Sequence, residues 1–146
     1  MIAGQHAGYV LDSSVVAKWF LEKERDRDCA LALRDLHITH RSTIFIPQLA
    51  IFEILNAVRF NANADEEDGR IALEALHDLH LETKLPDRDL LRKTNAIAWA
   101  YKITIYDALY VALAEQLGYP LITADETLAK KMKGHSIVVP LWDVEI

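Results

Sequence analysis

The sequence has a single cysteine, Cys29, and only five glycines and four prolines in 146 residues. One cysteine can form neither an internal disulfide nor a thiolate metal cluster, which excludes a disulfide-stapled secreted scaffold and a zinc ribbon. The low glycine and proline content excludes a collagen-like or low-complexity chain. We therefore expect residues 1–146 to form one globular domain in the reducing cytoplasm.

Long apolar runs are also missing. Residues 1–6 contain no basic stretch leading into an apolar one, and runs such as 96–101 are far too short to span a bilayer. We expect neither an export signal nor a membrane-embedded segment.

Positive charge is scarce, since 16 Lys and Arg stand against 22 Asp and Glu, a formal net charge of −6. Binding to nucleic acid phosphates needs clustered cations, so this average charge argues against a general nucleic-acid binder. Carboxylates that converge on divalent cations would invert the local field, and a phosphodiester could approach there.

Apolar runs typical of strands alternate with segments of helical periodicity. The predicted strands are 8–12, 43–47, 81–85, 119–125 and 136–141, and the predicted helices are 15–21, 26–37, 48–60, 71–80, 87–102, 104–117 and 126–133. The acidic stretch 61–69 predicts a surface connection within which the next helix can begin, and Gly118 suits a left-handed helix end. This alternation predicts a three-layer α/β/α fold with a mainly parallel central sheet.

Four acidic residues are candidates for one pocket. Asp12 and Asp125 end predicted strands, Asp107 lies in the first turn of the 104–117 helix, and Glu53 interrupts an apolar helical run. In open α/β sheets ligands bind beyond the carboxyl ends of the strands. An ionised carboxylate such as Glu53 is costly among apolar residues unless it is paired, metal-bound or at a cleft.

Helix capping is the competing explanation for three of these positions. Asp12 or Ser13 could cap the first helix. Thr104-x-x-Asp107 resembles a capping box, and Thr123-x-x-Glu126 is a full one. Glu53 has no such alternative, because it lacks an opposite charge at helical spacing.

The candidate ligands are oxygen atoms. No H-E-x-x-H motif or His–Cys pairing accompanies the acids. Hard carboxylate ligands favour Mg²⁺ or Mn²⁺ over zinc or copper.

Four stretches resemble the PIN-domain ribonucleases, and within them the VapC-type toxins of prokaryotic toxin–antitoxin pairs. They are YVLDSS at 9–14, FEILNA at 52–57, TIYDALYVALAE at 104–115 and LITADE at 121–126. The resemblance implies a PIN-like fold and places the family's acidic quartet on Asp12, Glu53, Asp107 and Asp125. It also implies that Thr123 and Ser13 support the site by hydrogen bonds. Some relatives have a further acid at the position of Thr127, so a complete second metal site is less certain here.

The resemblance implies a metal-dependent endoribonuclease that uses Mg²⁺ or Mn²⁺, RNA as the substrate, a cognate antitoxin and a homodimer. Asp12, Asp107 and Asp125 would be the principal metal ligands, and Glu53 a ligand or a water-orienting group. The cations that could rim the cleft and contact RNA are Lys18, Arg59, Lys102 and the lysines of 130–133.

Other functions compete with this hypothesis. A PIN scaffold that binds RNA or protein without cleavage is the main alternative. A phosphoaspartyl hydrolase would carry a second Asp at position 14, where this chain has Ser14, and the acid pair and late lysine of a receiver domain are incomplete.

Overall fold

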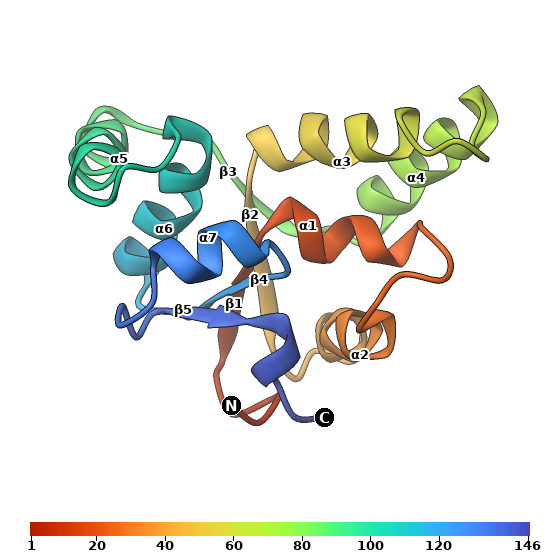
Figure 1. The fold of residues 1–146 in the computed structure, drawn as a ribbon. Coiled ribbons are helices and arrows are strands. Elements are labelled where there is room, and N and C mark those ends of the chain that lie inside the picture. Colours follow the sequence, from red (N-terminus) through yellow and green to blue (C-terminus); the bar gives the residue numbers. More distant parts are fainter.

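The computed structural model describes residues 1–146 and is built around a five-stranded sheet in which every pairing is parallel (Figure 1). The strand order is β3-β2-β1-β4-β5. The strands are β1 (Gly8–Leu11), β2 (Thr43–Pro47), β3 (Glu82–Lys84), β4 (Leu121–Thr123) and β5 (Val138–Pro140). The helices are α1 (Ser13–Val16), α2 (Arg27–Ile38), α3 (Leu49–Arg59), α4 (Glu66–Asp78), α5 (Arg88–Tyr101), α6 (Ile105–Leu117) and α7 (Glu126–Lys131).

Helices cover both sides of the sheet, which confirms the predicted three layers. In Figure 1, α5 and α6 lie to the left of β1 and β2, and α1 and α2 lie to the right. The two chain ends lie together at the bottom of the view, where the Ala3 backbone N–H donates to the Glu145 carbonyl at 2.7 Å. No helix combines the length and apolarity that a bilayer crossing requires.

The core forms between the central strand and helix α6. All four residues of β1 are buried, and so is the unbroken run Ala108–Ala114 of α6. A helix that is apolar on all sides must be enclosed, and α6 packs against the sheet on one side and α5 on the other. Gly118 ends α6 with φ +73°, the predicted left-handed conformation.

The first predicted helix is shorter than its periodicity indicated. Instead of one helix over 15–21, α1 covers four residues and a single 3₁₀ turn, Ala17–Trp19, follows it. The guanidinium of Arg27 donates to the Lys18 and Trp19 carbonyls at 2.8 and 3.1 Å. These carbonyls would otherwise accept bonds from a following helical turn, so a distant side chain ends the helix.

Two further elements differ in extent from the prediction. The last strand covers Val138–Pro140 rather than 136–141, and α4 begins at Glu66 inside the predicted connection. Asp65 and Asp68 close a capping box there, each side chain accepting the other's backbone N–H. The short strand β3 pairs only with β2 at the sheet edge.

Candidate active site

Three of the four candidate acids lie where an element meets the carboxyl edge of the sheet. Asp12 directly follows β1, and Asp125 follows the neighbouring strand β4. Asp107 lies in the first turn of α6, and Glu53 reaches toward the same region from α3. Parallel neighbours end at the same sheet edge, so topology alone brings the residues after β1 and β4 together.

The pKa values of these carboxyls show that their charges act on one another. The pKa of Asp12 is raised to about 6, chiefly by burial and also by the charges of Asp107 and Glu53, while hydrogen bonds from Ser14 and Thr123 oppose the rise. The pKa of Asp107 is raised by its burial and then by Asp125 and Glu53. All four predicted acids therefore share one field of negative charge.

Asp12 is held by two hydroxyl groups. Ser14 Oγ and Thr123 Oγ1 donate to its Oδ2 at 2.7 and 2.8 Å, and the side chain is almost fully buried. Its other oxygen, Oδ1, accepts no hydrogen bond from the chain, and no buried side-chain oxygen or nitrogen in the protein lacks a partner. Oδ1 therefore faces the solvent of the site and is the atom free to bind a ligand.

The two hydroxyls also order the backbone after β4. Thr123 Oγ1 accepts the Asp125 N–H at 3.1 Å, and Ser14 Oγ accepts the Ala124 N–H at 3.0 Å. Thr123 thus has the supporting contact predicted for it. The serine that donates to Asp12 is Ser14, the neighbour of the predicted Ser13. Ser13 instead lies beside the Tyr110 hydroxyl, where it opposes the rise in the pKa of that group.

Capping explains only some of the acids. Asp12 precedes α1, but its side chain makes no capping bond, so the capping interpretation of Asp12 is wrong. Thr104 caps α6 by accepting the Asp107 N–H at 3.0 Å, which leaves the Asp107 carboxylate available to the site. Asp125 itself caps α7 by accepting the Leu128 N–H at 3.1 Å. The N-cap residue of α7 is therefore Asp125 and not Thr123, so the predicted Thr123–Glu126 capping box is wrong by two residues.

Tyr110 is a site residue that the sequence reasoning missed. Its hydroxyl donates to Glu53 Oε1 at 2.6 Å, and the ring is completely buried. Burial raises the pKa of Tyr110, and the charges of Asp12 and Glu53 add to the rise. Tyr110 follows Asp107 by three positions, which places both on one face of α6. This spacing is the sequence feature that could have indicated Tyr110 as a site residue.

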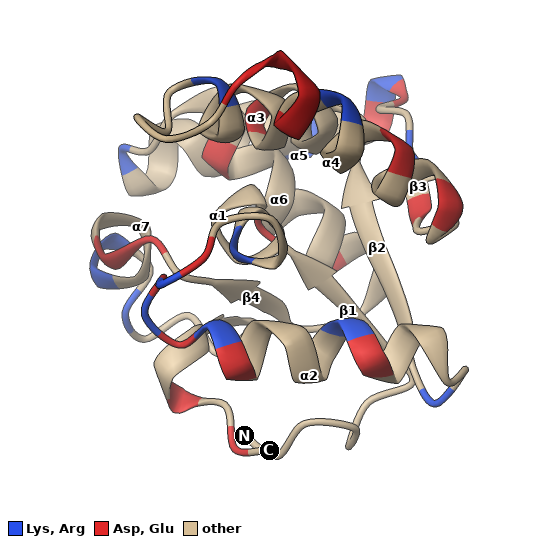
Figure 2. Ribbon diagram, turned by 90° about the vertical axis from the view of Figure 1, so that its right-hand side faces the viewer, with Lys and Arg blue, Asp and Glu red and all other residues tan.

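Few cations accompany the acids. None of the four carboxylates takes part in a salt bridge with Lys or Arg, although the charge of Lys131 lowers the pKa of Asp107. Lys18, one of the predicted rim cations, lies 3.7 Å from Glu24. Figure 2 shows basic and acidic residues interspersed along α2 and both signs on α7, rather than one broad basic face.

The donor set suits a hard divalent cation. Four carboxylates influence one another without a salt bridge to Lys or Arg, and Asp12 has one oxygen without a hydrogen bond from the chain. No three His, Cys, Asp or Glu side chains converge closely enough to enclose a metal ion by themselves. A divalent cation held here would therefore complete its coordination with water, as Mg²⁺ commonly does.

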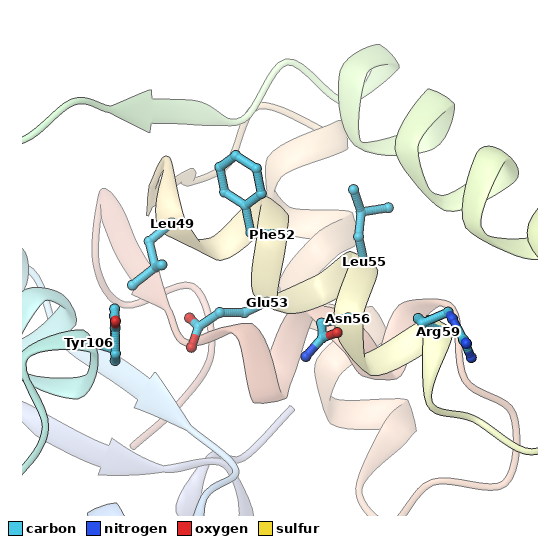
Figure 3. A pocket seen from close by; sticks show the side chains of 7 residues that line it. All are labelled: Leu49, Phe52, Glu53, Leu55, Asn56, Arg59 and Tyr106. Carbon is cyan, nitrogen blue, oxygen red and sulfur yellow. The ribbon is translucent and has the colours of Figure 1, made fainter.

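A shallow pocket opens beside Glu53 along α3 (Figure 3). It has a volume of about 550 Å³ and is lined by Leu49, Phe52, Glu53, Leu55, Asn56, Arg59 and Tyr106. Phe52 and Tyr106 expose about two thirds of their surface, at 67% and 60%. The pocket places aromatic rings and an amide along α3 beside Glu53, the one candidate acid that lines it, and Arg59 is the predicted rim cation that lies here.

Comparison with known proteins identifies the family. Residues 9–133 match the PIN domain model, a span that includes all four acids, Thr123 and Tyr110. This chain belongs to the PIN-domain family. The five-stranded parallel sheet is therefore a PIN fold, with the strand-end acids at its carboxyl edge.

Curated relatives of this PIN domain are ribonucleases by name and, in one case, an exonuclease. The chain is 30% identical to ribonuclease VapC3 of Pyrobaculum aerophilum over 126 residues, which cover 84% of this chain and 92% of the relative. It is 39% identical to ribonuclease VapC1 of Mycobacterium tuberculosis over 88 residues, 57% of this chain and 63% of the relative. A chain of a toxin–antitoxin complex from Klebsiella pneumoniae has the same fold, with a TM-score of 0.66, 20% identity, and coverage of 94% of this chain and 99% of that one.

Proposed function

We propose that this protein is a divalent-metal-dependent endoribonuclease and the toxin of a VapBC-type toxin–antitoxin pair. The PIN domain and the likeness to a VapC ribonuclease over 84% of this chain support the nuclease activity. The observation that carries the proposal is the group of four electrostatically coupled carboxylates, three of them at the carboxyl edge of the sheet and none in a salt bridge with Lys or Arg, with Asp12 fixed by two hydroxyls.

Each acid has a role that its surroundings support. Asp12 presents Oδ1 from a rigid, buried position, and Asp107 presents a half-buried carboxylate from the capped start of α6. Asp125 Oδ1 accepts the Leu128 backbone N–H, which fixes this carboxylate at the start of α7. These three would be the principal ligands of Mg²⁺ or Mn²⁺, with Glu53 a further ligand or the group that orients the attacking water.

RNA cleavage needs a nucleophilic water and a counter-charge for the phosphate. A bound divalent cation supplies both, because it lowers the pKa of water and neutralises negative charge on the phosphoryl oxygens. The residues of the chain hold the acids in place. Hydroxyl donors fix Asp12, a helix cap fixes Asp107, and a buried tyrosine fixes Glu53. The carboxylates would otherwise repel a phosphodiester, so an RNA-binding scaffold without metal chemistry fits this site less well.

The RNA strand, the antitoxin and a second copy of the chain are the partners we propose. The pocket beside Glu53 offers exposed aromatic rings and Arg59 to a single-stranded RNA next to the scissile phosphate. Structures of similar fold include toxin–antitoxin complexes, which supports an antitoxin partner. A basic antitoxin side chain among the carboxylates would compete with the metal.

The test is cleavage of pooled total RNA by the purified, antitoxin-free protein with Mg²⁺ or Mn²⁺, with chelator, and with Asp107→Asn. We expect metal-dependent cutting that Asp107→Asn abolishes while the fold remains. Asp89→Asn makes the same change at an exposed position on α5 and should cut like the wild type. Undiminished cutting by Asp107→Asn, or cutting in chelator, would refute the proposed mechanism.

A further inference from the structure

Glu53 is the one candidate acid that neither follows a strand nor lies at the capped start of a helix. A hydrogen bond between two helices fixes it instead. Glu53 lies in the middle of α3, and its side chain must cross the gap toward the acids carried by β1 and α6. Tyr110, 57 residues later in the chain, donates from α6 to Glu53 Oε1 at 2.6 Å. No other protein group donates a hydrogen bond to this carboxylate, and no Lys or Arg pairs with it.

We propose that Tyr110 is a positioning residue of the nuclease site, which holds Glu53 so that its free oxygen Oε2 faces the metal. The inference rests on the proposed function. A glutamate side chain has three rotatable bonds, and without Tyr110 the carboxylate would sample many positions along the open pocket of α3. With Oε1 engaged, one orientation is selected before any ligand arrives, which is how supporting residues tune a metal site.

The location of Tyr110 couples two acids through one helix. Asp107 and Tyr110 are one turn apart on α6, so the helix that presents Asp107 also sets the direction of Glu53. Tyr110 is completely buried, which gives its hydroxyl little freedom to move. Loss of the hydroxyl should therefore disturb Glu53 and leave the helix in place.

A purely structural role predicts a different outcome, and the chain contains a matched control. Tyr9 is the other completely buried tyrosine, and its hydroxyl accepts the backbone N–H groups of Gly4 and His6 at 2.8 and 3.2 Å. Tyr9→Phe also removes a hydroxyl from a completely buried tyrosine, but that hydroxyl bonds backbone groups near the N-terminus and not a candidate acid. If Tyr110 only stabilised the fold, the two variants would behave alike.

The experiment measures Mn²⁺ binding by titration calorimetry on metal-free wild type, Tyr110→Phe and Tyr9→Phe at pH 7.5. RNA cleavage as a function of Mn²⁺ concentration is recorded beside it. We expect Tyr110→Phe to weaken Mn²⁺ binding by about 10- to 100-fold and to shift the metal dependence of cleavage equally, with activity recovering at high Mn²⁺. Tyr9→Phe should lower the unfolding temperature only. Wild-type Mn²⁺ affinity in Tyr110→Phe, or an equal loss in Tyr9→Phe, would overturn the proposal.

Two further variants keep the test decisive. Glu53→Asp leaves the core untouched but shortens the carboxylate's reach, so it should weaken Mn²⁺ binding even if Tyr110→Phe fails to fold, and unchanged binding would overturn the proposal. Tyr110→Phe added to Glu53→Gln should cause no further loss of Mn²⁺ affinity, because both act through one group. Mn²⁺ binding without RNA cleavage by the wild type would refute the nuclease and leave the positioning role intact. A wild type that binds no Mn²⁺ would refute the positioning role.

Discussion

Thr123 Oγ1 donates to Asp12 Oδ2 at 2.8 Å and accepts the backbone N–H of Asp125 at 3.1 Å. One hydroxyl thus joins the acid after β1 to the acid after β4, and the Thr123–Asp12 bond spans 111 residues of sequence. The link sets both residues at the sheet edge before a metal or substrate binds. Several consequences of this arrangement can be measured.

Thr123→Val should lower RNA cleavage by about 10- to 100-fold, because Asp12 and the Asp125 backbone lose a shared partner. Valine fills the same volume, so the core stays packed. Thr94→Val is the matched control, since Thr94 is equally buried and its hydroxyl donates only to the Leu90 carbonyl within α5. Steady-state cleavage kinetics of both variants check this, and equal losses would assign Thr123 a purely structural role.

Asp12→Asn should stabilise the metal-free protein above pH 6 while abolishing cleavage. The pKa of Asp12 is about 6 in the fold against an ordinary value of 3.8. A carboxyl with a raised pKa contributes stability below pH 4 and loses it as the pH rises through 6. The wild type should lose up to about 3 kcal/mol over that window, given about 1.4 kcal/mol for each pH unit of pKa difference.

Urea denaturation of both proteins in chelator between pH 4 and pH 8 measures this effect. We expect the variant to have the flatter profile, with Asp107 contributing a remaining slope of the same sign, because its pKa is also raised. A variant whose profile over pH 4 to pH 6 has the same slope as the wild type would contradict the raised pKa of Asp12.

Asp125 has two separable roles, in the helix cap and in the acid cluster. Asparagine is as good an N-cap as aspartate, so Asp125→Asn should keep the α7 cap and stability but lower cleavage by removing charge. Asp125→Ala should lose the cap as well and cost about 1 kcal/mol of unfolding free energy. Thr104→Ala should cost similar stability through the α6 cap but retains all four acids, so its cleavage should fall less than that of Asp125→Ala.

Comparing unfolding free energy with cleavage rate for these three variants distinguishes the roles. If cleavage followed stability alone, Asp125→Asn would resemble the wild type and Thr104→Ala would resemble Asp125→Ala.

Mn²⁺ or Mg²⁺ should raise the unfolding temperature at pH 7.5, since a cation that binds only the folded acids stabilises them by mass action. The gain is about 2.7 kcal/mol at a hundred times the dissociation constant. Asp107→Asn should reduce the shift, and Asp89→Asn should preserve it. Thermal unfolding with and without chelator provides the measurement, and an unfolding temperature independent of metal would argue against a metal site at these residues.

The alternation of apolar runs and helical periods was enough to predict the three-layer fold. Successive strands are separated by helices, and the end of α6 at Gly118 follows from local preference alone. The lengths of α1 and β5 were not predictable in this way. Arg27 of α2 occupies the carbonyls of the 3₁₀ turn that follows α1, and no local pattern contains that contact.

The sequence by itself determined which acids follow strands or open helices, because a strand ending in Asp is visible in one dimension and parallel topology brings such ends together. Only the tertiary structure decided how these acids are held. Ser14 rather than Ser13 reaches Asp12, Thr123 supports the acid of another strand, and Tyr110 bonds Glu53 from another helix. Such contacts join residues far apart in the chain, and hydrogen bonds depend on distances and directions that exist only once the helices and strands have packed.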